Sequence, residues 1–334
     1  MKKLLIFSVA FLISTIALFS SFTSVNYNST NPDPPIVNEF DILVKYLESN
    51  GNFINSTASP AFIDADVVKQ NMKNAKYHLI DIRSESKFDA GHIKNANIVK
   101  PTELLSYFDY EIDPAEFDKI VIVCYSGQTA AYYTSLLRLA GYDNVYSMKW
   151  GMSSWRLDFA NASWNKALNS DYVSKLESTK STKAAKGSKP VLKTGESSGK
   201  DILTARLEKV FAVPYKESSV KSSVAFGNPG NYYIVSYRAT DKYSKGHIPK
   251  AMNYIPNASM SSTSDLYTLP TNKEILVTGA TGQGSAYVTA YLDLLGYNAS
   301  NLSYGTNGFM YKTVKSNGWE AFSKKEINMY PVVE

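Results

Sequence analysis

The sequence contains one pattern twice, and this repeat constrains the fold more than any other feature of the chain. The first copy includes YHLIDIRSESKFDAGHIKNA (77–96), and the second includes YYIVSYRATDKYSKGHIPKA (232–251). The arginine and the Gly-His-Ile triplet recur at an offset of 155 residues. A second pair, IVIVCYSGQTAAYYTSLLRLAGY (120–142) and EILVTGATGQGSAYVTAYLDLLGY (274–297), is aligned with one extra residue in the second copy. A chain of 334 residues with this self-similarity predicts two domains of one fold.

Short apolar runs alternate with helical patterns in each copy. A helix is predicted from Ala130 to Ala140, because Gly141 is a suitable residue to end it. The alternation predicts an α/β fold with two tandem three-layer domains, each a mainly parallel sheet with helices on both faces. In such sheets, ligands bind at the carboxyl ends of the strands. The candidate strands are 77–82, 97–100, 120–124, 144–148, 232–237, 252–255, 275–278 and 301–304.

Composition places the domain boundaries and an N-terminal targeting segment. We expect domains at 36–168 and 200–330, joined by a solvated linker at 169–199 that is rich in Lys, Ser, Thr and Gly. Residues 1–24 have two lysines followed by a long uncharged apolar run, which is typical of an export signal. The alternative is an uncleaved anchor. We therefore expect a periplasmic protein, or one anchored to the outer face of the inner membrane, with membrane contact only if the segment is uncleaved.

The overall composition excludes several partners. Hydrophobic residues make up 44% and charged residues 19% of the chain, as in a globular protein, and the net charge is only +5. The sequence shows no basic face of the kind that nucleic-acid binding needs. One cysteine and three histidines without ligand spacing predict no metal site, and no cofactor is expected.

Cys124 is the only cysteine of the chain, and it follows a strand pattern directly before a loop and a helix. A single thiol in an exported protein is either reactive or intermolecular. Backbone N–H groups of such a loop and the positive end of the helix dipole should surround the sulfur, so we expect the thiol pKa to be lowered. Gly127 permits the tight turn. The alternative is a buried cysteine that packs as a small hydrophobic residue.

The segments DIRSESKFDAGHIKNA, VCYSGQTAA and WGMSSW resemble the rhodanese, or sulfurtransferase, superfamily. The resemblance covers about 66–160 and, more weakly, about 200–325. It implies that Cys124 carries sulfur as a persulfide, from a small donor (thiosulfate, polysulfide or persulfide) to a thiol or cyanide acceptor. Residues 125–130 contain no Arg or Lys, unlike many thiosulfate enzymes, which puts thiosulfate preference in doubt. The residues expected to bind substrate are Tyr125, Ser126, Gly127, Gln128, Thr129 and Ala130.

Comparing the two copies distinguishes residues that serve the shared fold from residues that serve catalysis in only one domain. The alignment with one extra residue places Thr278 at the cysteine position, in a longer loop, so the first domain is expected to be catalytic and the second to be a non-catalytic partner. The histidines of both copies match, so His92 is interpreted as structural. Asp81 is matched by a serine, and an Asp81–Arg83 pair is expected to support the active loop from beneath. Lys87 is matched by a lysine, so it either binds an anion or is a solvated surface residue.

Other functions are weaker interpretations. A cysteine phosphatase or arsenate reductase needs an arginine six residues after the cysteine, where this chain has Ala130. The segment GATGQGSA (279–286) nearly matches a phosphate-binding P-loop, but Ser285 stands at the lysine position, which leaves a degenerate loop or a weak anion nest. The competing class of function is a non-catalytic binding or scaffold protein with the same fold.

Overall fold

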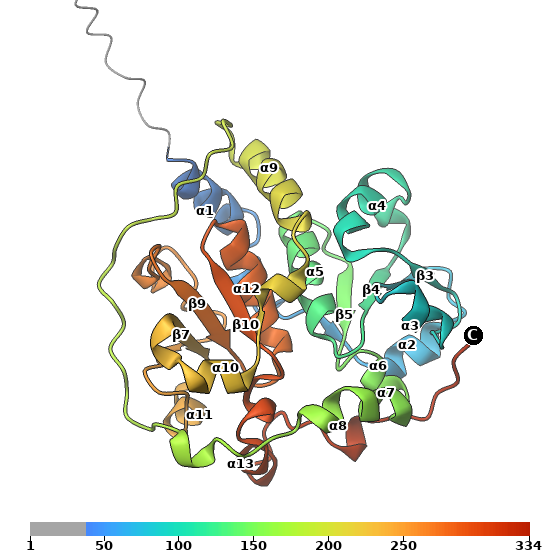
Figure 1. Ribbon diagram of the computed structural model, residues 1–334. Helices are drawn as coiled ribbons and strands as arrows, with labels where there is room; N and C mark the ends of the chain where they lie inside the picture. The colour runs from blue at the N-terminus through green and yellow to red at the C-terminus, as the bar shows by residue number, and fades with distance from the viewer. Residues whose placement is uncertain (1–37) are drawn as a thin grey trace, which may run out of the picture. The chain divides into compact units, whose positions relative to one another are not determined.

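The computed structural model describes residues 38–334 and contains two five-stranded parallel sheets (Figure 1). The predicted export segment 1–24 lies outside the described residues. The first sheet has the order β1-β5-β4-β2-β3, and the second has the matching order β6-β10-β9-β7-β8. The strands are β1 (Phe62–Ile63), β2 (Tyr77–Asp81), β3 (Ala96–Ile98), β4 (Lys119–Val123), β5 (Val145–Met148), β6 (Ser219–Val220), β7 (Tyr232–Tyr237), β8 (Met252–Tyr254), β9 (Glu274–Thr278) and β10 (Ala299–Leu302).

Helices cover both sheets, as the alternating sequence pattern predicted. The N-terminal α1 is followed by α2 to α8 in the first domain and α9 to α13 in the second. The helices are α1 (Glu39–Ser49), α2 (Ala65–Asn71), α3 (Glu85–Asp89), α4 (Leu104–Tyr110), α5 (Gln128–Leu139), α6 (Met152–Trp155), α7 (Leu157–Ala162), α8 (Trp164–Ala167), α9 (Gly199–Phe211), α10 (Ser222–Gly227), α11 (Thr240–Ser244), α12 (Gln283–Leu294) and α13 (Tyr311–Ser316). None of the helices among residues 38–334 has the length and apolar character that a membrane span requires.

The residue types of the central strands explain why they form the inner strands of the sheets. Residues 120–123 of β4 are β-branched and fully buried, which suits an inner strand of a parallel sheet covered on both faces. All eight predicted strands are confirmed, with ends that differ by two residues or fewer. The edge strands β1 and β6 were missed because each has only two residues and shows no periodic pattern.

The two domains meet through the first turns of α5 and α12, in a reciprocal arrangement. The side-chain oxygen of Gln128 accepts a hydrogen bond from the backbone N–H of Tyr304 at 2.8 Å. The side-chain oxygen of Gln283 accepts one from the backbone N–H of Trp150 at 2.7 Å. Further along the helices, the hydroxyl of Ser135 donates to a carbonyl of α12 at 2.9 Å. Each domain therefore holds the loop region of the other.

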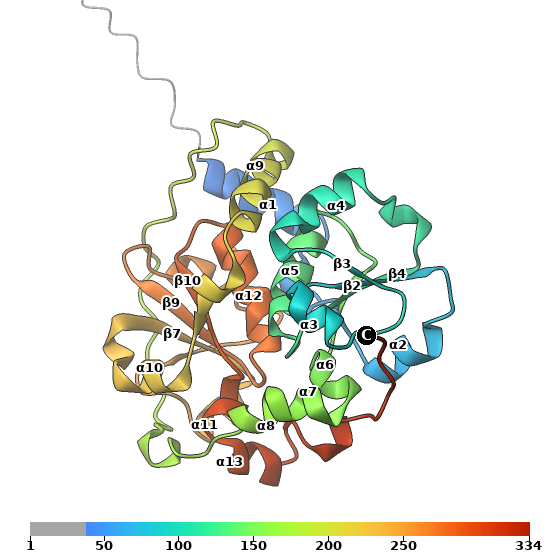
Figure 2. The ribbon, with the colours of Figure 1, turned by 45° about the vertical axis from the view of Figure 1, so that its right-hand side comes forward.

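The two ends of the described chain also connect the domains, because each end packs against the other domain. Helix α1 packs against α9, and the ring of Phe40 contacts the rings of Tyr267 and Tyr297. At the other end, the backbone of Val333 exchanges two hydrogen bonds with His92, so the C-terminus lies beside α2 and α3 in both views (Figures 1 and 2). In the second domain the linker takes this place, because Glu177 exchanges two backbone bonds with the matching histidine.

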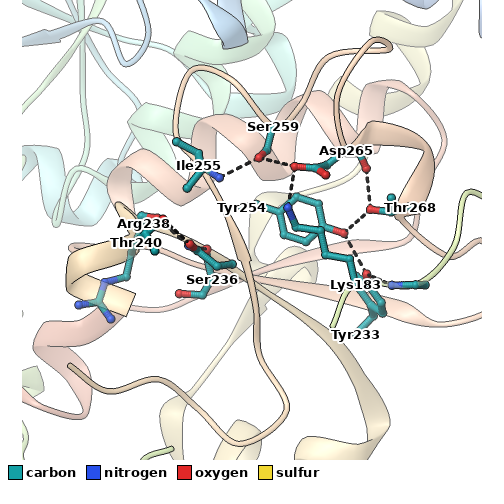
Figure 3. A network of polar contacts seen from close by, with 12 residues as sticks. Lys183, Tyr233, Ser236, Arg238, Thr240, Tyr254, Ile255, Ser259, Asp265 and Thr268 are labelled. Atoms are coloured by element: carbon teal, nitrogen blue, oxygen red, sulfur yellow. Dashed lines mark hydrogen bonds and ion pairs between the residues drawn. The ribbon is translucent and has the colours of Figure 1, made fainter. Parts of the chain in front are cut away.

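The predicted linker is mostly exposed, but it follows the second domain closely. Lys183 forms an ion pair with Asp265 at 2.6 Å and lies over the ring of Tyr254 (Figure 3). Lys189 pairs with Asp41 of α1, also at 2.6 Å, and the side chain of Leu192 is buried. The linker is therefore attached at several points along its length.

Candidate active site

Cys124 follows β4 directly and lies at the carboxyl edge of the first sheet, with a side chain that is 4% exposed. Its sulfur accepts hydrogen bonds from the backbone N–H groups of Gly127, at 3.2 Å, and of Ala130, at 3.3 Å. Gly127 has a φ of 83°, a value that glycine adopts without strain, and α5 begins at the next residue. The predicted cup of amides around the thiol is present.

The predicted lowering of the thiol pKa is wrong. Burial raises the pKa of the Cys124 thiol, and this effect exceeds the opposing effect of the amides of Ala130, Ser126 and Gly127. The nearby Asp81 carboxylate adds to the increase in pKa. The sequence pattern correctly indicated the donors, but it contained no information on how deeply the sulfur is buried.

Asp81 and Arg83 form a buried ion pair at the end of β2. The guanidinium donates to Oδ1 of Asp81 at 3.0 Å, to Oδ2 at 2.7 Å, and also to the carbonyl of Gly91 at 2.8 Å. The guanidinium carbon lies 5.9 Å from the ring centre of Tyr125, the residue after the cysteine. The pair therefore lies against the loop, where it was expected.

The remaining residues of the predicted substrate loop point in different directions. Ser126, Gln128 and Thr129 line the cleft described below, whereas Tyr125 packs edge-on against Phe159. The amide group of Gln128 donates to the Ser126 hydroxyl at 3.1 Å, while its oxygen accepts the bond from the second domain described above. Gly127 and Ala130 act through their backbone amides, as already described.

Lys87 and His92 each have contacts with a neighbouring aromatic ring. The ammonium of Lys87 lies 5.8 Å from the ring centre of Tyr125. His92 stacks on Phe88 and bonds to its carbonyl at 3.0 Å, and the matching His247 does the same with Tyr243 at 3.1 Å. This shared geometry suits a structural role for both histidines. Among residues 38–334, no group of three or more His, Cys, Asp or Glu side chains could hold a metal ion.

A cleft of about 1200 Å³ reaches the loop around Cys124, and both domains line it. The first domain contributes Arg83, Ser126 and Thr129, while the second contributes Tyr215 and Tyr304. Burial is the main cause of the raised pKa of each tyrosine, and the Cys124 charge adds to both shifts, so the two phenols lie within electrostatic range of the sulfur. Sequence reasoning missed them because only the packing of the domains brings them to the first-domain site.

The second domain matches the first without an inserted residue, which corrects the sequence alignment. Strands β4 and β9 each have five residues, and four residues separate each strand from the following helix. The carbonyls of Cys124 and Gly279 accept equivalent backbone bonds, from Met152 at 2.8 Å and from Thr306 at 3.0 Å. Gly279 therefore occupies the cysteine position, and Thr278 is the last residue of β9.

Comparisons with known proteins identify the family of the two domains. A sequence model of the rhodanese-like domain matches residues 64–158 and 219–312. Thiosulfate sulfurtransferase GlpE of Vibrio cholerae serotype O1 is 29% identical over 94 residues, which cover 28% of this chain and 85% of that protein. GlpE of Shewanella oneidensis is 36% identical over 78 residues, which cover 23% of this chain and 73% of that protein. A crystal structure of thiosulfate sulfurtransferase from Pseudomonas aeruginosa matches 88% of this chain and 49% of its own, with 13% identity and a TM-score of 0.30. The chain therefore belongs to the rhodanese-like family and contains two copies of its domain.

Proposed function

We propose that the protein is a sulfurtransferase that carries sulfane sulfur as a persulfide on Cys124. The observation that carries this proposal is the pair of amide donors, from Gly127 and Ala130, directed at the sulfur of the only cysteine. Both a thiolate and a persulfide are anions, so the same amides can stabilise the sulfur before and after it is loaded. The printed names of the relatives, thiosulfate sulfurtransferase GlpE, support this class of reaction.

The reaction divides into two transfers of one sulfur atom. In the first, the Cys124 thiolate attacks the sulfane sulfur of the donor, a new S–S bond forms, and the donor bond breaks so that its electron pair leaves with the remaining anion. In the second, a thiolate or cyanide acceptor attacks the outer sulfur, and the Cys124 thiolate leaves. No net oxidant or reductant is required, because each step exchanges one bond to sulfur for another.

The size of the cleft favours a substrate with an organic body. A volume of about 1200 Å³ exceeds the 300–1,000 Å³ typical of drug-sized ligands, whereas thiosulfate has only five heavy atoms. Tyr133, Tyr215 and Tyr304 supply aromatic surface, and Ser126 and Thr129 supply hydroxyls. We therefore favour an organic persulfide as donor or an organic thiol as acceptor, with inorganic thiosulfate as a slower substrate.

The proposed place of action is outside the cytoplasm. The support is the uncharged apolar run after two lysines in residues 1–24. In a bacterial host, cell fractionation should recover the protein from the periplasm or from the outer face of the inner membrane. N-terminal sequencing of the mature protein distinguishes a cleaved signal from an anchor, and a cytoplasmic protein that begins at Met1 would contradict this placement.

A second candidate, a non-catalytic binding protein, is favoured by the burial and the raised pKa of Cys124. A thiol that remains protonated at neutral pH is a poor nucleophile. The sulfurtransferase proposal therefore includes an opening of the cleft that hydrates the sulfur before attack. If only binding takes place, a sulfur donor would associate with the cleft without modifying the thiol.

The test compares the full chain with its Cys124→Ser variant, using thiosulfate, inorganic polysulfide and an organic persulfide as donors. Cyanide and an organic thiol serve as acceptors, and the product is measured. The wild type should turn over, fastest with the organic persulfide, and the serine variant should lose this activity while its thermal unfolding is nearly unchanged. Equal activity in both proteins would refute the role of Cys124, and wild type that binds donors without turnover would establish the binding protein.

A further inference from the structure

The second domain retains a pocket at the place that corresponds to the Cys124 cleft. Its volume is about 210 Å³, and its lining includes Arg238, Lys242, Gly279 and Ser285. Lys242 is partly buried, and the exposed Glu320 completes the rim. Because Gly279 has no side chain, this domain has no thiol at the position of Cys124, and the side chain of Ser285 packs against Gly279 instead.

The pocket has a buried positive charge that the protein does not neutralise. Arg238 is 4% exposed, and its guanidinium donates to the carbonyls of Gly246 and Lys242, both at 3.0 Å. Among residues 38–334, no carboxylate lies within ion-pair distance of it, because Ser236 replaces the aspartate that pairs with the arginine of the first domain. Burial lowers the pKa of Arg238 to about 10, and Asp241 opposes this effect only in part.

Ser236 and Arg238 lie near Thr240, in a group separate from the Lys183–Asp265 network (Figure 3). The Ser236 hydroxyl is buried, at 1% exposure, has no hydrogen-bond partner among the described residues, and does not itself line the pocket. A buried cation and a buried hydroxyl without a partner are both costly unless another group satisfies them.

A second hydroxyl, that of Ser285, lies directly beside Gly279 in the pocket lining. Ser285 is fully buried in the first turn of the twelve-residue helix α12, and its Oγ has no hydrogen-bond partner in the described part of the chain. A Cβ atom at Gly279 would lie 3.1 Å from both the Cβ and the Oγ of Ser285 and 3.3 Å from the Ser285 amide nitrogen, so the serine side chain is in close contact with the glycine. The hydroxyl and the positive end of the helix dipole therefore lie at the part of the pocket wall that Gly279 and Ser285 form.

We propose that this pocket of the second domain binds a small oxyanion, such as sulfate, phosphate or a carboxylate. The anion would accept hydrogen bonds from Ser285 and the loop amides, and it would balance the charge of Arg238 and Lys242. The volume of about 210 Å³ suits an ion of this size better than a nucleotide. The first domain has an internal substitute for such an ion, because the Asp81 carboxylate neutralises its arginine and the Cys124 sulfur fills its cup. This proposal does not depend on the sulfurtransferase activity.

The test is calorimetric titration of the full chain with sulfate, followed by phosphate, acetate and a nucleotide. Ser236→Asp should abolish sulfate binding at this site, because it supplies the carboxylate that pairs with the arginine in the first domain. Ser285→Ala should weaken binding about tenfold or more, as expected for a lost hydrogen bond to a charged group. Each substitution introduces the residue that the first domain has at the matching position, so we expect both variants to fold.

A matched pair of lysines provides the control for general charge effects. Lys242→Gln should weaken sulfate binding, whereas Lys245→Gln should not, because Lys245 is exposed and outside the pocket lining. Fluorescence gives an independent readout, since the ring of Trp319 lies 5.5 Å from the guanidinium carbon of Arg238. Unchanged affinity in both Ser236→Asp and Ser285→Ala, or no sulfate binding by the wild type, would overturn the proposal.

Discussion

Gly127 and Gly141 lie at the two ends of α5, and both have a positive φ, of 83° and 105°. Their surroundings differ. A Cβ atom at Gly127 would overlap the side-chain oxygen of Gln283 and would lie 3.0 Å from the backbone nitrogen of Trp150. A Cβ atom at Gly141 would have no neighbouring atom within 4 Å. Comparing the stability losses caused by alanine at these two positions therefore separates the cost of backbone strain from the cost of losing the contact with the second domain.

The expected magnitudes differ accordingly. Alanine in the left-handed region costs about 1–2 kcal/mol, and this is the whole effect expected for Gly141→Ala. Gly127→Ala also displaces Gln283 from its 2.7 Å bond with the Trp150 amide, which leaves a buried donor unpaired at a cost of about 1–3 kcal/mol. We therefore expect a total loss of about 2–5 kcal/mol for Gly127→Ala, together with a fall in sulfur transfer because this amide donates to the Cys124 sulfur.

Urea unfolding and a sulfur-transfer assay on both variants measure these losses. Gln283→Ala in the Gly127→Ala background should relieve the overlap, so the double variant should be more stable than the sum of the two single losses predicts. Equal destabilisation by Gly127→Ala and Gly141→Ala, or strictly additive effects in the double variant, would refute the role of the contact between the domains.

Three further predictions concern the charges and the cysteine position. Asp81→Asn should reduce the free energy of unfolding by about 3–5 kcal/mol, because it leaves a buried guanidinium without a carboxylate; a loss below about 1 kcal/mol in urea unfolding would contradict this. Persulfide formation on Cys124 should accelerate as the pH rises beyond the pKa of a free thiol, because the folded-state pKa is raised. The neutral Cys124 thiol should contribute its full stabilisation of the fold below the pKa of the unfolded-state thiol, and this contribution should be lost as the pH rises through the higher folded-state pKa. A rate of persulfide formation that levels off at a lower pH than that of a free thiol would contradict the raised pKa. Gly279→Cys with Ser285→Ala should accept sulfur when Cys124 is serine, whereas Thr278→Cys should not; mass spectrometry decides, and the reverse result would show that the structural alignment is wrong.

The sequence was sufficient to predict the repeat, eight of the ten strands of the described residues and the amide cup. Residues 120–123 form a uniform β-branched run, and Gly127 and Gly141 mark the ends of the following helix, so local chemistry determines this part of the structure. The alignment of the second loop failed at Gly279. The similarity of the two loops is low there, and only the ends of β9 and α12 fix which residue follows the strand.

Properties that depend on tertiary packing could not be predicted. The direction of the Cys124 pKa shift depends on the balance between burial and hydrogen bonds, and the local pattern shows only the hydrogen bonds. Tyr215 and Tyr304 reach the cleft from the second domain, and their positions in the sequence give no sign of this. The cross-domain bonds of Gln128 and Gln283 are likewise visible only when the domains are packed together.

The central claim is that Cys124 carries sulfur covalently, and intact-protein mass spectrometry tests it most directly. The full chain is incubated with an organic persulfide or with thiosulfate, separated from the donor and weighed, and the modified residue is located by fragmentation. The account predicts a gain of one sulfur atom on Cys124, its loss on addition of an acceptor thiol or cyanide, and no gain in the Cys124→Ser variant. A wild type that gains no sulfur from any donor, or a serine variant that gains as much, would contradict it.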